Sequence, residues 1–161
     1  MAFDKGNILH GSCTVTLSGV GVGYTKDGVK LRESTTFLDI EADQASGTIR
    51  KDPTVEKMFV TFNMLEAMPA NIINAMHGAA AGSGDVAFGS AEPETVEHTL
   101  VLVGPGPSGV TRTYTFYRAV KIDDTEHTVG ARNAVGELPV TFELLKDPSN
   151  AYTFGYFTDA A

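Results

Sequence analysis

Polar and apolar residues alternate along most of the chain, and the apolar positions are rich in β-branched and aromatic residues. Gly, Pro, Asp or Asn interrupts this alternation about every ten residues, as expected for successive β-strands joined by turns. The clearest alternation covers Val55 to Leu65 and Arg112 to Ile122. The apolar side of the first segment is formed by Met58, Val60, Phe62 and Met64. The whole pattern predicts about eight strands.

Shorter strands are predicted on both sides of these two segments. They cover residues 13–17, 29–33, 37–41, 99–103, 138–145 and 152–157. Asp27 and Gly28 are a typical pair for a tight turn, so we expect a turn immediately before the strand at 29–33.

A single stretch has a helical pattern, from Pro69 to His77. Proline favours the first position of a helix, and Gly78 follows the last periodic residue, where glycine commonly ends a helix. Ile72, Ile73 and Met76 are expected to form its apolar stripe and to pack on the sheet.

Residues 78–97 are rich in Ala, Gly and Ser and show no clear periodicity. We expect a long flexible surface loop there, with at most one short strand near Val86 to Phe88. The chain, residues 1–161, is expected to form one mostly-β domain, a β-sandwich or open barrel with the helix on one side. Such a sheet has exposed edges, which can pair with another chain.

The charge balance excludes some functions. The chain of 161 residues has 20 acidic and 12 basic residues, for a net charge of −8. This balance argues against a surface that holds nucleic acid by neutralising phosphates. Cys13 is the only cysteine, so no internal disulfide can form and a reducing compartment is expected. With no apolar run of signal-peptide or membrane-span length, we expect a soluble protein made in the cytoplasm.

The spacing Gly104-x-Gly106-x-x-Gly109 matches a dinucleotide-binding fingerprint. That fingerprint requires a helix immediately afterwards, whose amides meet the phosphate, but the following residues have a strand pattern. Pro105 and Pro107 also remove two of the amides that would be needed. We therefore predict a hairpin loop at this position.

The remaining candidates for chemistry also favour structural roles. His10, His77, His98 and His127 show no paired spacing that suggests zinc. Cys13 beside His10 could form a nucleophile and base, but a thiol on a strand is usually buried and inert. The acidic cluster at residues 123–127 lacks the glycine and the distal glutamate of a calcium loop, which favours a solvated turn. We expect no catalytic residue, no metal and no cofactor.

The order of elements resembles a known family, the tail tube (major tail) proteins of long-tailed bacteriophages. The similarity starts with Gly23 to Val29 and the strand Phe37 to Asp43, which leads into a loop with Gly47. It continues with a strand, Phe59 to Ala67, that runs directly into the only helix, Asn71 to Ala75. It ends with Arg118 to Val120 and the closing segment Leu138 to Asp147.

This resemblance implies a structural virion protein without enzymatic activity. Six copies would join their sheets into a ring with a continuous inner barrel, the helix would lie outside, and rings would stack into a hollow tube. Viral DNA would pass through the tube in transit, without specific binding. Other tail proteins, such as the length ruler and the terminator, would be partners, and no membrane would be involved.

The resemblance also suggests roles for particular residues. By strand alternation, the lumen-facing candidates are Glu33, Asp39, Glu41, Thr141 and Glu143. Residues 42–56 are the candidate ring-stacking loop, which we expect to become ordered on assembly. Its residues for complementary pairing with a neighbour are Ser46, Arg50, Lys51, Asp52 and Glu56. The N-terminal arm, residues 1–12, is a second candidate for ring contact, and an additional immunoglobulin-like domain is not expected.

Three alternatives remain open. Another ring former of the same shape, such as a secretion-system tube or a tail terminator, would share most of these features. A monomeric β-barrel could instead use the apolar strand faces to line a pocket for a small ligand. An enzyme is the third class, and no set of residues supports it.

Overall fold

The computed structural model describes residues 11–41, 46–76, 79–80, 84–89, 95–130 and 136–160. Eight strands form one antiparallel sheet: β1 (Thr14–Leu17), β2 (Val20–Gly21), β3 (Thr25–Glu41), β4 (Thr48–Met64), β7 (Glu97–Pro105), β8 (Thr111–Lys121), β9 (Leu138–Leu145) and β10 (Gly155–Ala160). The other elements are the strand pair β5 (Ala79–Ala80) and β6 (Val86–Ala87), the helix α1 (Pro69–Met76), and the 3-10 turns η2 (Pro107–Gly109) and η3 (Pro148–Asn150). The described chain is therefore mostly β with one short α-helix, as predicted.

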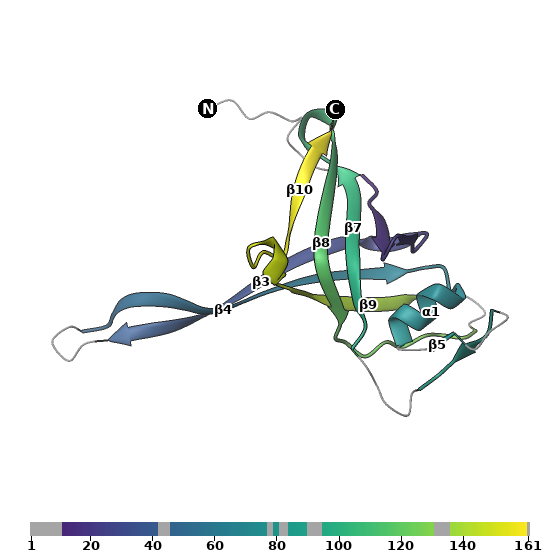
Figure 1. Cartoon of the computed structure of the whole chain (residues 1–161), viewed down its shortest axis with the longest axis horizontal. Helices are drawn as coiled ribbons and strands as arrows, with labels where there is room; N and C mark the ends of the chain where they lie inside the picture. Colours follow the sequence, from purple (N-terminus) through teal and green to yellow (C-terminus); the bar gives the residue numbers. More distant parts are fainter. Residues whose placement is uncertain are drawn as a thin grey trace.

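The sheet is divided into two layers by β8. The strand order is β2-β1-β7-β8-β9-β4-β3, and β10 also pairs with β8. Residues 111–116 of β8 pair with β10, whereas residues 118–121 pair with β9. One edge of β8 thus carries two different neighbours in succession. Figure 1 shows the result: β7, β8 and β10, which belong to the upper layer with β1, stand upright. The lower layer, β3, β4 and β9, runs across the picture at the level of the middle and lower parts of β7 and β8.

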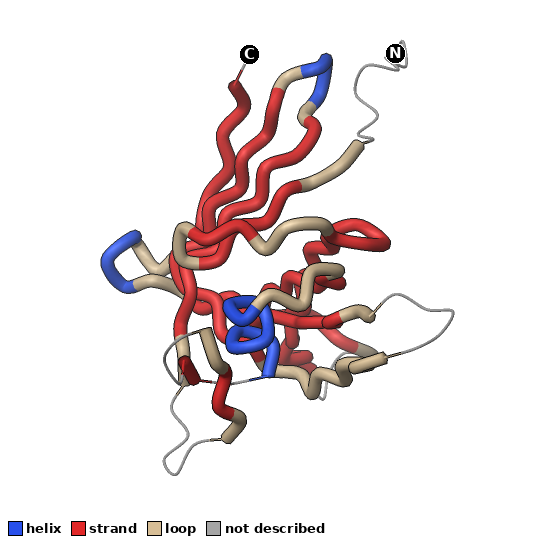
Figure 2. Tube along the Cα trace, turned by 90° about the vertical axis from the view of Figure 1, so that its right-hand side faces the viewer, coloured by secondary structure: helices blue, strands red, loops and turns tan. Residues whose placement is uncertain are grey.

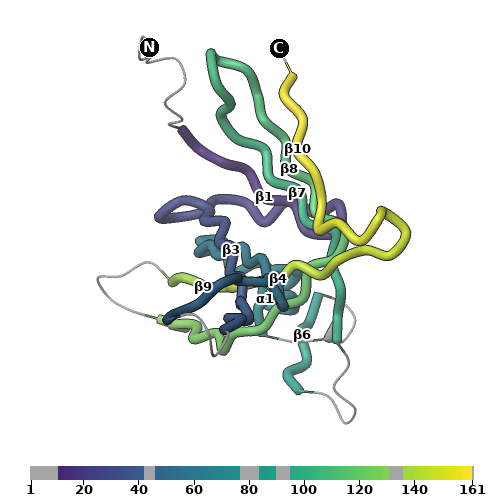
Figure 3. Tube along the Cα trace, turned by 90° about the vertical axis from the view of Figure 1, so that its left-hand side faces the viewer, coloured from purple at the N-terminus to yellow at the C-terminus, as the bar shows by residue number. Residues whose placement is uncertain are grey.

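The hydrophobic core fills the space between the two layers. The upper layer contributes buried residues of β1, β7 and β8, and the lower layer contributes buried residues of β4 and β9. The rings of Phe62 and Phe142 stack with their centres 5.9 Å apart. The predicted apolar side of β4 faces this core, because Val60, Phe62 and Met64 are buried and Met58 packs against them. Figure 3 shows the upper strands side by side, above the strands of the lower layer.

The helix lies against β9 and confirms the predicted segment, although His77 lies outside the described residues. Two residues of the predicted apolar stripe, Ile72 and Met76, pack against the core, but they are not the most buried positions of the helix. Asn71 and Ala75 are the buried residues, whereas Ile72 and Met76 are partly buried against the core and Ile73 is half-buried. Figure 2 shows α1 beside the strands of the lower layer.

Asn71 is buried because its side-chain amide finds two partners. Its Nδ2 donates to the carbonyl oxygens of Val22, at 2.8 Å, and of Glu66, at 2.7 Å. Both carbonyls belong to segments without strand or helix hydrogen bonds at those positions, so the amide joins the helix to the start of β3 and the end of β4.

Replacing Asn71 with alanine is expected to lower the free energy of unfolding by about 2 kcal/mol, because two carbonyl groups lose their donor. Urea denaturation measures this change. The matched control is Asn74→Ala on the same helix, a half-buried position for which we expect a change within about 0.5 kcal/mol. Equal effects of the two substitutions would contradict the role given to Asn71.

The pair Asp27 and Gly28 lies inside β3 and does not form the predicted turn. Lys26 pairs with Asn63 and Lys30 pairs with Thr61, so β3 has extra residues opposite Phe62. Asp27 and Gly28 both have positive φ, at 63° and 75°. Residues that adopt positive φ easily suit a β-bulge as well as a tight turn. The Asp-Gly pair therefore marks an irregular backbone position, but that position is a bulge within β3.

The predicted stacking loop is also different in the structure. β4 starts at Thr48, so most of the segment 42–56 is a strand paired with β3, and residues 42–45 lie outside the described part. Of the N-terminal arm, only residues 11 and 12 are described. Within 78–97, the short strand near Val86 is confirmed as β6, and its partner β5 was not predicted.

The predicted hairpin loop between β7 and β8 is confirmed. The amide of Gly106 donates to the carbonyl oxygen of Val110 at 2.8 Å, and β8 follows immediately, where a dinucleotide site would need a helix. The final strand begins at Gly155 and not at residue 152, because the turn η3 comes first. Ala151 and Tyr152, which follow it, have positive φ and cannot continue a strand.

Candidate assembly surface

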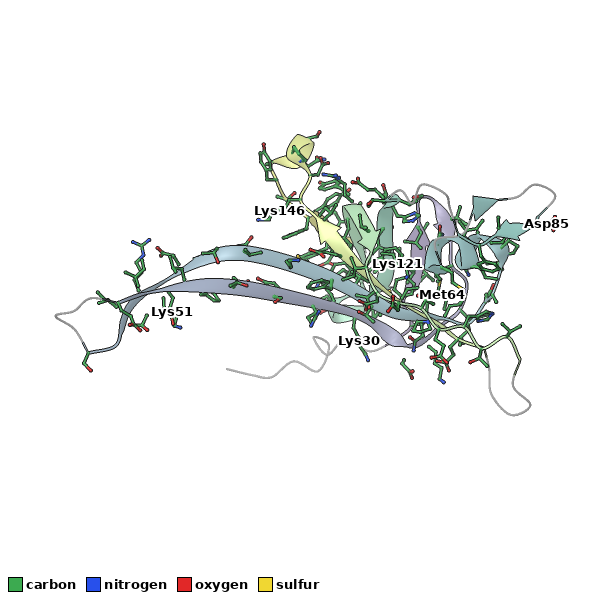
Figure 4. All side chains as sticks on the ribbon, turned by 90° about the horizontal axis from the view of Figure 1, so that it is seen from below. Lys30, Lys51, Met64, Asp85, Lys121 and Lys146 are labelled. Carbon is green, nitrogen blue, oxygen red and sulfur yellow. The ribbon has the colours of Figure 1, made fainter. Side chains whose placement is uncertain are left out.

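The long hairpin formed by β3 and β4 is the most unusual feature of the molecule. Each strand has 17 residues, and β9 pairs only with residues 58–64 of β4. In the described chain, the remaining residues of β4, from Thr48 to Lys57, pair with β3 alone. Figures 1 and 4 show this part of the hairpin extending away from the rest of the protein. A two-stranded hairpin alone in water is marginally stable, so this segment is expected to gain stability from a further contact.

Several large apolar side chains on this extension are exposed. Phe37, Leu38, Ile40, Ile49 and Val55 are each at least 36% exposed. Leu38 and Ile40 share one face with Val55, because Val55 pairs with Thr36, while Phe37 points to the other face with Pro53. Apolar groups gathered on an exposed segment indicate an interaction surface.

The charged residues proposed for ring stacking are paired within the chain. Arg50 binds Asp52, Lys51 binds Asp39 with Nζ and Oδ1 2.8 Å apart, and Glu56 binds Lys146 at 2.7 Å. These charges were predicted to pair with a neighbouring copy, but in the structure they already pair within the chain. Exposed ion pairs contribute at most about 1 kcal/mol each to stability. The exposed apolar side chains are therefore the part of the hairpin that gains most from contact with another chain. Ser46 lies exposed where the described part of the hairpin resumes.

The structure places the lumen-facing candidates on two opposite faces. Glu143 pairs with Phe59, which pairs with Arg32, so these three side chains share one face. Glu33 pairs with Met58 and shares the face of the core. A single surface of the lower layer cannot present both Glu33 and Glu143.

The other candidates follow the same division. Asp39 and Glu41 are exposed and lie on the same face of β3 as Glu33. Thr141 lies on the opposite face, with Glu143. Thr141 is buried and its hydroxyl lies 3.2 Å from that of Thr61, and Glu143 is bound by Lys57 at 3.0 Å. The face of Thr141 and Glu143 also carries the basic residues Lys30 and Arg32, and Arg32 lies 4.5 Å above the ring of Phe59.

An apolar groove lies where the hairpin meets the upper layer. Its volume is about 470 Å³, and its apolar lining comes from Leu31, Met58, Tyr114, Phe116, Phe154 and Phe157. A second hollow of about 390 Å³ adjoins it, since Leu31 and Tyr114 line both. Lys146 and Glu56, which form an ion pair, also line the groove. The groove is therefore lined mainly by apolar side chains, and its two charged lining residues, Lys146 and Glu56, pair with each other.

The outermost strands have free edges. In the part of the chain that the structure describes, β3 pairs only with β4, and β10 pairs only with β8. β3 is long and lacks the neighbour that would cover its edge. Free edges of this length favour pairing or packing with another chain.

Two arginines hold the upper layer together. Arg112 binds Asp159 through two hydrogen bonds of 2.6 and 2.7 Å and lies 4.3 Å above the ring of Phe157. Arg118 binds Glu97 in the same bidentate way. These hydrogen bonds lower the pKa of Asp159 and of Glu97, and the side-chain amide of Asn150 lowers the pKa of Asp147. The charged form of each carboxylate therefore stabilises the folded protein.

The stability of the protein is expected to fall in acid through these three carboxylates. Their folded pKa values lie below the unfolded values of about 4, so the stabilisation is complete above that pH and is lost as the pH falls through the folded pKa values. Asp159→Asn should lower the melting temperature at pH 7 and reduce its decline from pH 5 to pH 2. The control is Asp123→Asn on an exposed loop. An unchanged acid profile for Asp159→Asn would contradict this account.

Two of the residues weighed as catalytic or metal candidates, His98 and Cys13, have structural surroundings. His98 is buried, with its Nδ1 3.2 Å from the Ser18 hydroxyl and its ring edge-on to Phe142. Burial raises the pKa of the Cys13 thiol, which disfavours the reactive thiolate. His10 and His77 lie outside the described residues. Among the residues with described positions, no group of His, Cys, Asp and Glu could hold a metal ion, and no helix could cross a membrane.

No protein-family model matches the chain, and no curated protein matches its sequence. The hairpin, the groove and the free edges are therefore the features that bear on function.

Proposed function

We propose that this protein is a structural subunit that assembles with copies of itself into a tube, in the manner of the tail tube proteins of long-tailed bacteriophages. The observation that carries the proposal is the extension of β3 and β4 beyond β9. Seventeen-residue strands with exposed apolar side chains on both faces are a liability for a monomer. In a subunit, a neighbouring copy covers the same segment.

A tube requires that two different surfaces of the subunit meet. The hairpin extends to one side of the molecule and the groove lies at its base, so a contact between them joins two different surfaces (Figure 4). Contacts of this head-to-tail kind close into rings or continue as helical stacks. The family resemblance supplies the form that we propose, hexameric rings stacked into a hollow tail, with the tail ruler and terminator as partners in the virion.

The net charge of −8 supports a role as a conduit. A tube that passes DNA must not bind it, and a negative protein repels the phosphate backbone. We propose that viral DNA touches the lumen only in transit during ejection. Such a role requires no enzymatic activity, and the subunit would be made in the host cytoplasm before it enters the virion.

A monomeric binding protein for a small apolar ligand is the second candidate. The two adjoining hollows of about 390 and 470 Å³ have the size of a small-molecule site. This reading explains the groove but does not explain the extended hairpin, so self-assembly accounts for more of the structure.

Light scattering during size-exclusion chromatography separates these two functions. Self-assembly predicts that the mass rises far above 17.1 kDa as the protein concentration increases. A binding protein would stay at 17.1 kDa at every concentration and would bind an apolar dye such as 1-anilinonaphthalene-8-sulfonate at one site per chain. A constant monomeric mass would refute the proposed function.

A further inference from the structure

We propose that the outer face of the hairpin, formed by Leu38, Ile40 and Val55, docks into the groove at the base of the hairpin of a second copy. The groove is the one lined by Leu31, Met58, Tyr114, Phe116, Phe154 and Phe157. This inference rests on the proposed self-assembly and identifies the two surfaces that meet.

The hairpin cannot fill the groove of its own chain. Leu31 pairs with Val60 and faces the core, so odd-numbered positions of β3 from Leu31 to Phe37 share the groove side. Leu38 and Ile40 point to the opposite face of the same strand. A twisted pair of strands would have to break its register to bring these side chains to its own groove. A hairpin that fills this groove must therefore belong to another copy of the chain.

The two surfaces match in chemistry. The hairpin face offers exposed aliphatic side chains, and the groove offers aromatic rings, with Tyr114 and Phe116 stacked 6.5 Å apart. Asp52 and Arg50 lie on this hairpin face, opposite Leu38 and Ile40, and pair with each other. In the groove, Lys146 pairs with Glu56. Docking therefore buries apolar area without leaving an unpaired charge in the interface, which would be costly.

The contact determines how the assembly grows. Each copy has one hairpin to donate and one groove to fill, and the two surfaces are different. Every docked copy therefore leaves one hairpin and one groove free at the ends of the chain of subunits, until a ring closes. This arrangement differs from a symmetric dimer, in which two hairpins would pack on each other and growth would stop.

Directional disulfide crosslinking tests this contact. In a Cys13→Ser background, one variant carries Leu38→Cys on the hairpin and a second carries Thr153→Cys, an exposed residue that also lines the groove. Mixed and oxidised, the two variants should form a crosslinked dimer at least tenfold faster than either variant alone. A matched control replaces Leu38→Cys with Asp85→Cys, which lies at the far end of the molecule from the hairpin (Figure 4).

A protein that carries both Leu38→Cys and Thr153→Cys should form a ladder of crosslinked oligomers on non-reducing gels. Crosslinks of Leu38→Cys mainly to itself would indicate a symmetric contact and overturn the inference. Assembly with crosslinking no faster than the Asp85→Cys control would also overturn it, while the proposed function would stand. If the Cys13→Ser parent stays monomeric in light scattering, both proposals fail.

Discussion

A protein without the far part of its hairpin is expected to remain folded and to lose self-assembly completely. The change replaces residues 35–56 by the turn Asn-Gly, which joins Ser34 to its partner Lys57. The deleted segment contains none of the buried core residues, because Phe59 and Val60 are the first buried residues of β4. We therefore expect the unfolding free energy to change by no more than about 1 kcal/mol.

Light scattering and urea denaturation measure the two effects of this deletion separately. The matched control keeps the hairpin and exchanges one of its ion pairs, with Asp39→Lys combined with Lys51→Asp. Because this variant preserves the pair and all apolar side chains, it should assemble like the original protein. A shortened protein that still forms large assemblies would show that the hairpin is dispensable. A loss of assembly in the exchanged variant would show that the charges carry the contact.

Replacing Phe142 with alanine is expected to destabilise the fold by about 3–5 kcal/mol. Phe142 is completely buried on β9, where its ring lies 5.9 Å from the rings of both Phe62 and His98. Its side chain joins the two layers, since Phe62 belongs to β4 in the lower layer and His98 to β7 in the upper layer. The substitution leaves a cavity at this junction, and the surrounding strands can close it only in part.

Urea denaturation measures the loss at Phe142. The control is Phe88→Ala, because Phe88 is 66% exposed and its removal should change stability by no more than about 0.5 kcal/mol. A loss below about 1 kcal/mol for Phe142→Ala would contradict the assignment of the core to the space between the layers.

Residue alternation predicted the parts of the fold that have one buried and one exposed face. The bounds of β9 agree with the predicted strand 138–145, and the inner side of β4 is the predicted one. In these strands, burial selects apolar residues at every second position, and the period can be read directly. The helix is short, and its segment was found from Pro69 and its apolar residues.

The same reasoning failed where burial does not select residues. Residues 48–56 lie on a strand that is exposed on both faces, so polar and charged residues are tolerated there and the segment resembles a loop. Asn71 was missed because an apolar stripe was sought, and its role depends on carbonyl groups of Val22 and Glu66 that lie elsewhere in the chain. The helix carries two polar residues, Asn71 and Asn74, and only the structure distinguishes the buried one from the half-buried one.

The groove could not be predicted from local patterns. Leu31, Tyr114 and Phe157 lie on three different strands, and only the change of partner along β8 brings these strands together. The separation of Glu33 from Glu143 has a similar origin. Alternation places residues on faces within one strand, but the relative faces of β3 and β9 depend on their register with β4.

Electron microscopy of the concentrated protein in negative stain tests the proposed function most directly. The account predicts striated hollow tubes built from stacked rings, formed by the protein alone or with its length ruler. Dispersed particles of a single 17.1 kDa chain at the same high concentration would contradict it.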